Sequence, residues 1–557
     1  MKRSSVFLLV IALLGSLVLG QTGAYTDRTS SFDANKMLER VKRLSADDFE
    51  GRGPGTEGGK RAAQYVADQF KTIGAKPANR GGYFQNVRLV GVKADRAAKL
   101  NVSKASDTQS YSFGDDYVAT TGSQSAEARV NAEIVFVGYG IDAPNYKWND
   151  YKGPAADYKG KVLMMLVNDP PATADEPDLF AGKALTYYGR WTYKYEEAAR
   201  RGAAGVILVH TTESAGYGWN VVRTSNGNWR YEIARTPADK TPFLQFKSWT
   251  TNDAATKILK QAGLDIDKLR EAATHRDFQP VKTGLKVSLD LKSEVKRLES
   301  PNIVATVEGS DPELSKEYVV YSAHWDHLGV GEADSRGDKI YNGAYDNASG
   351  VAAVLGIAEV LAKMPKADRP KRSALFLIPT AEEQGLLGAE YYSTHPLVPL
   401  SKTVADINLD GVNIFGKVRD FTALGGERSS MAEFIDAAAK ERGFVIKPDA
   451  NPEKGFYFRS DHFPFAKVGV PSVNFQHGDD FVGTVNPEAL SFSKEYTEKY
   501  YHQPSDEFHD WFDGAAMVQE TEFALAFGTK IANSYAAPHY KPTDEFAPAE
   551  EKRLGAR

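Results

Sequence analysis

The sequence predicts an α/β protein built on a mixed, largely parallel sheet flanked by helices. From about residue 300 onward, short apolar runs alternate with helical patterns, which is typical of parallel sheets. Three of these runs end at or just before an acidic residue or a histidine. The chain has 557 residues, a length that favours about three or four structural units over one.

Residues 1–24 have the pattern of a secretory signal peptide. Lys2 and Arg3 precede an apolar run over 6–19, and the small residues Gly20 and Ala24 follow. A membrane anchor is the alternative, but the run is short for a bilayer span and no comparable stretch follows it. We therefore expect cleavage, export and no stable membrane insertion of the mature chain.

Composition restricts the classes of function. The chain is 42% hydrophobic and 25% charged, as in soluble globular proteins. A formal net charge of −5 favours neither a nucleic-acid partner nor an anionic membrane surface. The absence of cysteine excludes disulfides, thiol catalysis and thiolate metal ligands. An exported protein without disulfides fits a bacterial periplasm or the medium, and any metal ligands must be His, Asp or Glu.

The first part of the main domain is expected over residues 25–109. It contains two helical stretches around a glycine-rich turn at 50–59, and in the second of them Ala63, Val66 and Phe70 recur at helical spacing. The turn lacks the Gly-Lys-Ser/Thr ending of a phosphate-binding loop, so we interpret it as a plain turn.

A separate inserted unit with both helices and strands is expected over residues 110–290. Strands are predicted over 132–140 and 161–169, and a helix, a glycine turn and a strand over 195–210. His210 ends the last of these strands and is interpreted as structural or solvated. The aromatic-rich segment 187–231 fits a ligand groove or ordinary core packing equally well.

The second part of the main domain is expected over residues 291–537. Its predicted elements are strands at 318–323, 374–379, 403–409 and 470–476 and helices at 350–362 and 514–535. The remaining residues, 538–557, are charged and contain prolines, and we expect a mobile tail.

Five short stretches in this part carry residues able to bind metal ions. In chain order they supply His324 with Asp326, Asp346, the pair Glu382 and Glu383, Asp410, and His502. Three of the stretches follow predicted strands, and in open α/β sheets sites form outside the carboxyl ends of strands. Imidazoles combined with carboxylates suit zinc, with cobalt or manganese as weaker fits.

Each stretch also has an ordinary structural interpretation when taken alone. The pair His324 and Asp326 could be a surface ion pair, Asp346 could begin a helix, and Glu382 and Glu383 could form a solvated turn. Together they favour a hydrolytic metal site, because one carboxylate remains free to act as a base. In this interpretation Asp326 accepts a hydrogen bond from His324 and fixes its ring.

The five motifs, in this order, resemble those of the M28 family of zinc peptidases, over roughly residues 35–105 and 295–535. The resemblance implies a zinc-dependent exopeptidase fold, and the middle segment looks like an inserted protease-associated domain. It implies two zinc ions, one held by His324 and Asp410, the other by Glu383 and His502, with Asp346 and a water or hydroxide between them.

The same resemblance implies that Glu382 is the general base and that Asp326 orients His324. It suggests that Tyr501 and Arg459 contact the substrate, and that the peptide bond after Asp346 is cis. The implied activity is removal of N-terminal residues from peptides. A carboxypeptidase of the same family and a non-enzymatic binding protein on the same scaffold remain alternatives, and a protein partner of the inserted domain stays unknown.

Overall fold

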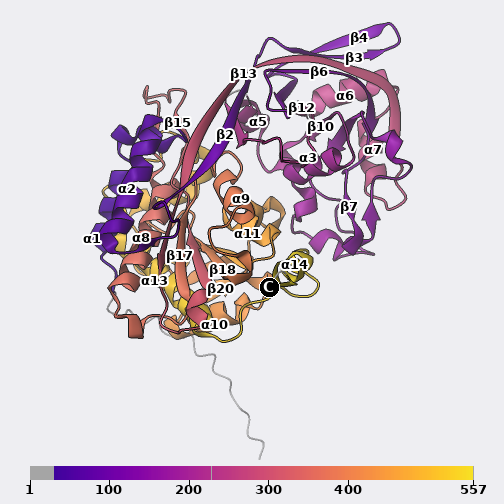
Figure 1. The fold of residues 1–557 in the computed structure, drawn as a ribbon. Coiled ribbons are helices and arrows are strands. Elements are labelled where there is room, and N and C mark those ends of the chain that lie inside the picture. The colour runs from indigo at the N-terminus through magenta and orange to yellow at the C-terminus, as the bar shows by residue number, and fades with distance from the viewer. Residues whose placement is uncertain (1–30, 227–228, 556–557) are drawn as a thin grey trace, which may run out of the picture.

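The computed structural model describes residues 31–226 and 229–555, which form two parts joined by a pair of long strands (Figure 1). The predicted signal peptide, residues 1–24, lies outside the described residues. Within the described residues, no helix is long and apolar enough to cross a membrane.

Four parallel strands form the centre of the main sheet, in the order β17-β14-β18-β21. Their bounds agree with the predicted strands: β14 Tyr318–Ser322, β17 Ser373–Ile378, β18 Thr403–Asn408 and β21 Ser472–His477. Antiparallel strands extend both sides: β13 (Val281–Val307) pairs with β17, and β19 (Asp420–Leu424) pairs with β21 and carries β20 (Val445–Lys447) on its other side. The prediction of a mixed, largely parallel sheet is confirmed for this part.

Helices cover both faces of the main sheet (Figure 1). Phe376 and Ile378 of β17 point into the core beneath one helical layer, whereas Leu375 and Leu377 point into the opposite core, because strand side chains alternate. The first layer contains α1 Ala34–Leu44, α2 Glu57–Ile73, α8 Gly350–Lys363, α10 Met431–Arg442 and α13 Gly514–Asn533. The second contains α9 Leu387–Thr394 and α11 His462–Lys467.

The strands β2 (Phe84–Ala94) and β13 carry the chain between the two parts. The second half of β13 pairs with β2 and β17, whereas its first half pairs with β6 (Glu127–Phe136) in the other sheet. That sheet continues from β6 through three parallel strands to an antiparallel edge strand: β9 Val162–Leu166, β10 Gly205–His210, β12 Phe246–Thr251 and β5 Tyr117–Thr121.

The inserted part has helices and an apolar core of its own. Its main helices are α3 Trp191–Arg200, α6 Asn252–Gln261 and α7 Ile266–Ala273, and shorter elements include α4 Thr212–Ala215, α5 Trp219–Asn226 and β11 Arg230–Ile233. Strand β11 pairs with β2, so the insert also touches the strand that leads into it. His210 is buried and its Nε2 lies 2.9 Å from the Tyr217 carbonyl oxygen, which agrees with a structural role.

The insert begins earlier than residue 110, the predicted boundary. The hairpin β3 (Lys99–Lys104) and β4 (Asp107–Ser112) belongs to the insert sheet, since β3 pairs with residues 286–288 of β13. Leu100 and Val102 are buried in the insert core. We therefore define the insert as residues 95–292.

The expectation of a mobile tail over residues 538–557 is wrong for the part described. Tyr540 and Phe546 are buried against the second layer of the main domain, and α14 (Ala547–Gly555) follows. The guanidinium of Arg553 donates to the carbonyl oxygens of Gly469 and Thr403, each at 2.8 Å. Charged composition suggested solvent, but these aromatic and arginine contacts fix the segment.

Candidate metal centre

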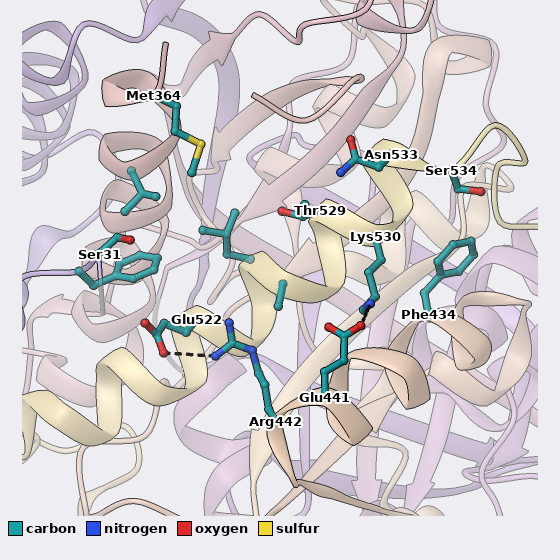
Figure 2. Close-up of a pocket in the computed structure, with 14 residues that line it drawn as sticks. Ser31, Met364, Phe434, Glu441, Arg442, Glu522, Thr529, Lys530, Asn533 and Ser534 are labelled. Carbon is teal, nitrogen blue, oxygen red and sulfur yellow. Dashed lines mark hydrogen bonds and ion pairs between the residues drawn. The ribbon is translucent and has the colours of Figure 1, made fainter. Parts of the chain in front are cut away.

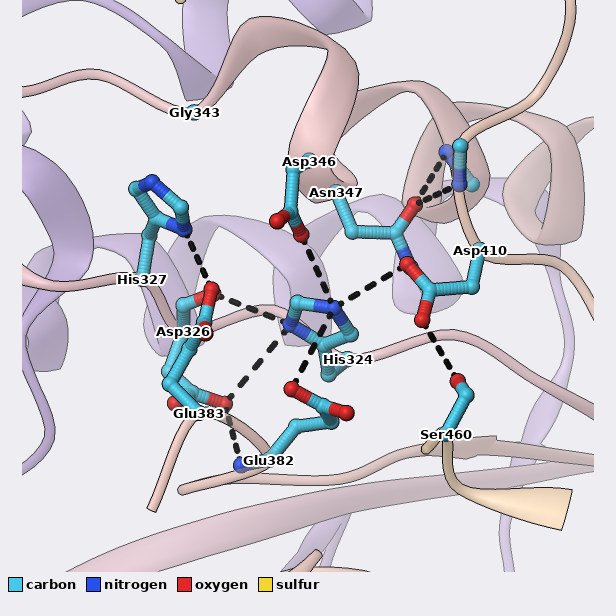
Figure 3. Close-up of polar contacts among 12 residues, drawn as sticks. His324, Asp326, His327, Gly343, Asp346, Asn347, Glu382, Glu383, Asp410 and Ser460 are labelled. Carbon is cyan, nitrogen blue, oxygen red and sulfur yellow. Dashed lines mark hydrogen bonds and ion pairs between the residues drawn. The ribbon is translucent and has the colours of Figure 1, made fainter. Parts of the chain in front are cut away.

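Three of the five predicted stretches meet because they follow neighbouring parallel strands (Figure 3). His324 lies two residues beyond β14, Asp410 lies two residues beyond β18, and Glu382 and Glu383 lie in a turn shortly after β17. The carboxyl ends of parallel strands lie at the same edge of a sheet, so the three stretches converge there. Their convergence confirms the expectation drawn from strand order.

Asp346 lies between two groups of side chains and offers one carboxylate oxygen to each. Its Oδ1 is 3.2 Å from His324 Nε2, and that nitrogen is 3.3 Å from Asp410 Oδ1. Its Oδ2 is 3.5 Å from His502 Nε2, which lies 2.8 Å from Glu383 Oε2. The carboxylate therefore has the position of a bridge between two adjacent sites.

His327 is part of the same centre and was not among the predicted residues. Its ring is fully buried, and its Nδ1 lies 2.6 Å from Glu383 Oε1. The two oxygens of Glu383 thus face two different histidines. The residue follows His324-Trp325-Asp326 directly, so its position in the motif was the available signal.

The donor atoms fit transition-metal ions. Three triads of described residues have their donor atoms within 4.8 Å of one another: His324 with Asp346 and Asp410, His327 with Asp346 and Glu383, and His324 with Glu382 and Glu383. Several carboxyl groups share this buried space, and burying that much negative charge is costly unless cations compensate it. Mixed imidazole and carboxylate ligands match the preferences of zinc.

Asp506 holds the backbone around Asp346. Its carboxylate accepts the main-chain N–H groups of Tyr345 at 2.9 Å and Asp346 at 3.0 Å. The peptide bond between Asp346 and Asn347 is cis, as the resemblance implied. Asn347 then donates to the Leu409 carbonyl oxygen, next to Asp410, at 3.0 Å. The two ligand-bearing turns are therefore tied to each other.

Arg52 connects three segments beneath the centre, and no local sequence pattern predicts this role. Its guanidinium donates to the carbonyl oxygens of Trp325 and Leu44 at 2.8 Å, Gly343 at 2.9 Å and Asn342 at 2.5 Å. Burial lowers the pKa of Arg52 to about 10, against the raising effect of nearby carboxylates, so it remains charged at neutral pH. The segments before His324 and Asp346 are thereby fixed relative to each other.

The two adjacent glutamates differ in their surroundings. Burial raises the pKa of the Glu382 carboxyl well above its usual range, against the effect of His324. Burial also acts to raise the pKa of Glu383, but His502 and His327 together outweigh it and the pKa falls to about 2. Glu383 is therefore a permanent carboxylate suited to a metal, whereas Glu382 can exchange a proton.

Asp326 contacts His324 differently from the prediction. The Nδ1 of His324 lies 3.1 Å from the main-chain oxygen of Asp326, while the nearer carboxylate oxygen is 4.0 Å away. That same carboxylate oxygen accepts the main-chain N–H of Glu382 at 3.2 Å. Asp326 thus holds the imidazole through its carbonyl group and the glutamate turn through its side chain.

Tyr501 and Arg459 border the centre on the side of the insert. The Tyr501 ring is 47% exposed and stacks on His502 with a centroid separation of 3.7 Å. Arg459 donates to the Lys454 carbonyl oxygen at 2.6 Å and lies 5.9 Å from the ring centroid of Tyr217 in the insert. Their predicted contact with substrate stays a prediction.

A pocket of about 730 Å³ lies elsewhere in the main domain, between α8, α10 and α13 (Figure 2). Its charged side chains are paired with each other, Arg442 with Glu522 at 3.3 Å and Lys530 with Glu441. None of the candidate metal ligands lines it. We therefore assign it no part in the metal centre.

Comparison with known proteins agrees with this geometry. Residues 302–527 match the model of peptidase family M28. Aminopeptidase YwaD of Bacillus subtilis is 33% identical over 168 residues, which are 29% of this chain and 32% of that protein. The vacuolar membrane protease of Saccharomyces cerevisiae is 33% identical over 167 residues, 30% of this chain and 15% of that protein. The match thus spans about a third or less of the length of these relatives.

Solved structures align over most of the chain. The aminopeptidase from Aneurinibacillus sp. strain AM-1 aligns with a TM-score of 0.49 at 19% identity, covering 92% of this chain and 95% of that one. The family match contains all five ligand-bearing stretches, from His324 to His502. Residues 302–527 of this chain, which hold the whole candidate metal centre, are therefore similar to peptidase family M28.

Proposed function

We propose that this chain is an exported metallopeptidase that uses two zinc ions to remove residues from the N-termini of peptides. The observation that carries the proposal is the position of Asp346. One of its oxygens faces His324 and Asp410, and the other faces His502 and Glu383. A carboxylate shared by two ligand groups is what a two-metal hydrolytic site requires.

In this proposal His324 and Asp410 would hold one zinc, Glu383 and His502 would hold the other, and Asp346 would bind both. His327 holds Glu383 from the opposite side through the 2.6 Å contact at Oε1, which leaves Oε2 facing His502. Hydrogen bonds of this kind orient metal-binding side chains and raise metal affinity. Two bound zinc ions would lower the pKa of a water between them and polarise the scissile carbonyl group.

Glu382 is the general base in the proposed reaction. Its carboxyl oxygen Oε2 lies 3.9 Å from His324 Nε2, at the edge of the ligand set, and its main-chain N–H is held by Asp326. The carboxylate takes a proton from the attacking water and then donates that proton to the leaving amine nitrogen. Because burial raises its pKa, the carboxylate takes up this proton readily.

One relative supports the proposed direction of cleavage. The Bacillus subtilis relative is named an aminopeptidase, and the yeast relative is named a protease. The alternatives are a carboxypeptidase with the same metal centre and a binding protein that has lost catalysis. Retention of every ligand and of Glu382 argues against the binding protein.

A zinc-supplemented assay on aminoacyl chromogenic substrates tests the proposal. Each substrate is compared with its N-acetylated form, and an N-blocked peptide with a free carboxyl end serves as the carboxypeptidase substrate. Cleavage that requires a free amine supports an aminopeptidase. Activity confined to N-blocked substrates would replace it with the carboxypeptidase.

The insert and the N-terminal segment complete the proposal. We infer that residues 95–292 are a protease-associated domain, which the resemblance of the middle segment supports. The signal-like pattern of residues 1–24 and the lack of cysteine support export in a bacterium. Retention of the protein in the cytoplasm after expression in a secreting host would contradict that part.

A further inference from the structure

A row of buried polar side chains lies behind Asp410, on the sheet face covered by α11. Asp406, Ser322 and Asn408 have no measurable exposure, and Ser460 is 4% exposed. None of these side chains was predicted from the sequence. Buried polar groups are costly unless they bond to one another, so the order of their bonds carries information.

Strand pairing brings the members of this row together. Ser322 of β14 lies opposite Asn408 of β18, and Asn408 lies opposite Asn474 of β21. Asp406 stands two residues before Asn408, so its side chain points to the same face. Ser460 belongs to the turn before α11 and reaches the row from above the sheet.

At the end of the row nearest the metal centre, the hydrogen bonds are donated from Asn408 to Ser460 and from Ser460 to Asp410. Asn408 Nδ2 donates to Ser460 Oγ at 2.7 Å and approaches Asn474 Oδ1 at 3.3 Å. Ser460 Oγ lies 2.5 Å from Asp410 Oδ2. Because Ser460 has a single proton and already accepts one bond from Asn408, that proton is directed to Asp410.

The other end of the row requires one more proton. Ser322 Oγ lies 2.9 Å from Asp406 Oδ1 and 3.0 Å from Asn408 Oδ1. If Asp406 Oδ1 and Asn408 Oδ1 were both acceptors, the single hydroxyl proton of Ser322 would satisfy one contact and leave the other contact without a proton. Exchanging the positions of the Asn408 amide oxygen and nitrogen does not help. The 2.7 Å contact between Asn408 and Ser460 would then lack a proton instead. A proton on Asp406 satisfies every contact.

We propose that Asp406 is a buried neutral carboxylic acid at the head of a chain of hydrogen-bond donors that runs through Ser322, Asn408 and Ser460 to Asp410. The chain occupies Asp410 Oδ2 and leaves Oδ1, which lies 3.3 Å from His324 Nε2, to bind the metal. Asp406 and Ser460 are thus positioning residues. The inference rests on the zinc site proposed above.

The surroundings of Asp406 agree with the neutral form. Its second oxygen, Oδ2, is buried and has no hydrogen-bond partner among the described residues. Burial raises the pKa of Asp406 well above its usual range, although the Ser322 hydroxyl opposes this. An ionised carboxylate with a bare oxygen at this depth would be far more costly than the acid.

Two substitutions of the full-length protein separate this chain from a merely structural role. Ser460→Ala removes the donor to Asp410 and is expected to weaken zinc binding about 10–100-fold. Asp406→Asn keeps a neutral donor of the same shape, so its zinc affinity and turnover are expected to equal those of the wild type. Zinc dissociation constants are measured by competition with a chelator, and folding is checked by thermal unfolding. Ser248→Ala, which removes a buried serine of the insert that bonds the Val206 carbonyl oxygen at 2.8 Å, is the matched control.

Infrared spectra test the protonation directly. The difference between wild type and Asp406→Asn should contain a protonated carboxyl band at neutral pH, with or without zinc. Absence of that band, or a zinc affinity of Asp406→Asn that falls as far as that of Ser460→Ala, would overturn the proposal. If the wild type binds zinc but Ser460→Ala binds it equally well, the donor chain is wrong and the zinc site stands. If the wild type binds no zinc, the proposed function fails and this inference fails with it.

Discussion

Replacing Arg52 by lysine is expected to loosen the metal centre without touching a metal ligand. The guanidinium serves four carbonyl oxygens in three segments, whereas an ammonium group presents its donors from a single nitrogen and cannot span them. About two buried carbonyl groups would lose their partners. At about 1–3 kcal/mol for each unsatisfied group, the free energy of unfolding should fall by about 2–6 kcal/mol.

The affinity for zinc should fall together with the stability. Arg52 bonds the carbonyl oxygen of Trp325, next to His324, and that of Gly343, three residues before Asp346. Looser segments hold their ligands less well, and we expect zinc binding to weaken about 10–100-fold, as for other changes behind a metal site. Urea unfolding of the metal-free protein and chelator competition measure the two effects separately.

Arg372→Lys is the matched control for this prediction. Arg372 is also buried and donates to the carbonyl oxygens of Ile531 and Ser534, but it lies at the opposite end of the sheet strands. It should lower stability and leave zinc affinity unchanged. The reasoning is refuted if Arg52→Lys alters neither quantity, or if both variants weaken zinc binding equally.

Three further predictions concern Glu382, Glu359 and Arg553. Glu382→Gln should keep its zinc while turnover falls about 10²–10⁴-fold, measured by metal analysis beside the peptidase assay; retained turnover would remove Glu382 as the base. Glu359 on α8 is desolvated, but cations outweigh this and lower its pKa from 4.5 to about 2: Lys36, Lys363 and Arg40. The ionised form therefore stabilises the fold above pH 4.5, and this contribution is lost as the pH falls toward 2. Glu359→Gln should be less stable by about 1–2 kcal/mol at pH 7, less than the full shift implies because two of the cations are exposed lysines, and the gap should close below pH 4.5. A gap independent of pH would contradict this. Arg553→Ala should lower the thermal stability of the main domain; an unchanged melting temperature would mean that the C-terminal helix contributes nothing to it.

The sequence predicted where the candidate metal ligands come together because their positions depend on a local pattern. His324, Asp410 and the glutamate pair each follow an apolar run, and parallel strands bring such ends together whatever the details of packing. Asp346 and His502 do not follow predicted strands, and the roles expected of them came from the family resemblance.

The residues that support the ligands could not be predicted in the same way. Arg52 bonds main-chain carbonyl groups of segments nearly 300 residues away. Every residue has such a carbonyl group, so the sequence does not indicate which ones Arg52 contacts. The row from Asp406 to Ser460 depends on the register between strands, and a shift of one residue would turn those side chains to the opposite face. His327 was within reach, because it adjoins a motif that had been identified.

The domain limits show where composition misleads. The hairpin over residues 99–112 is polar on its exposed side, and its assignment to the insert became clear only from its pairing with β13. The last segment is rich in charge and proline, yet Tyr540 and Phe546 bury their rings against the main domain. A few aromatic anchors outweighed the composition of the whole segment.

The number of zinc ions bound per chain tests the central claim most directly. Metal analysis of the wild-type protein, after zinc loading and removal of excess metal, should give two ions per chain. Asp346→Ala removes the shared carboxylate and should reduce occupancy of both sites. A wild-type value of one or none, or two ions retained tightly by Asp346→Ala, would contradict the proposal that Asp346 joins two metal sites.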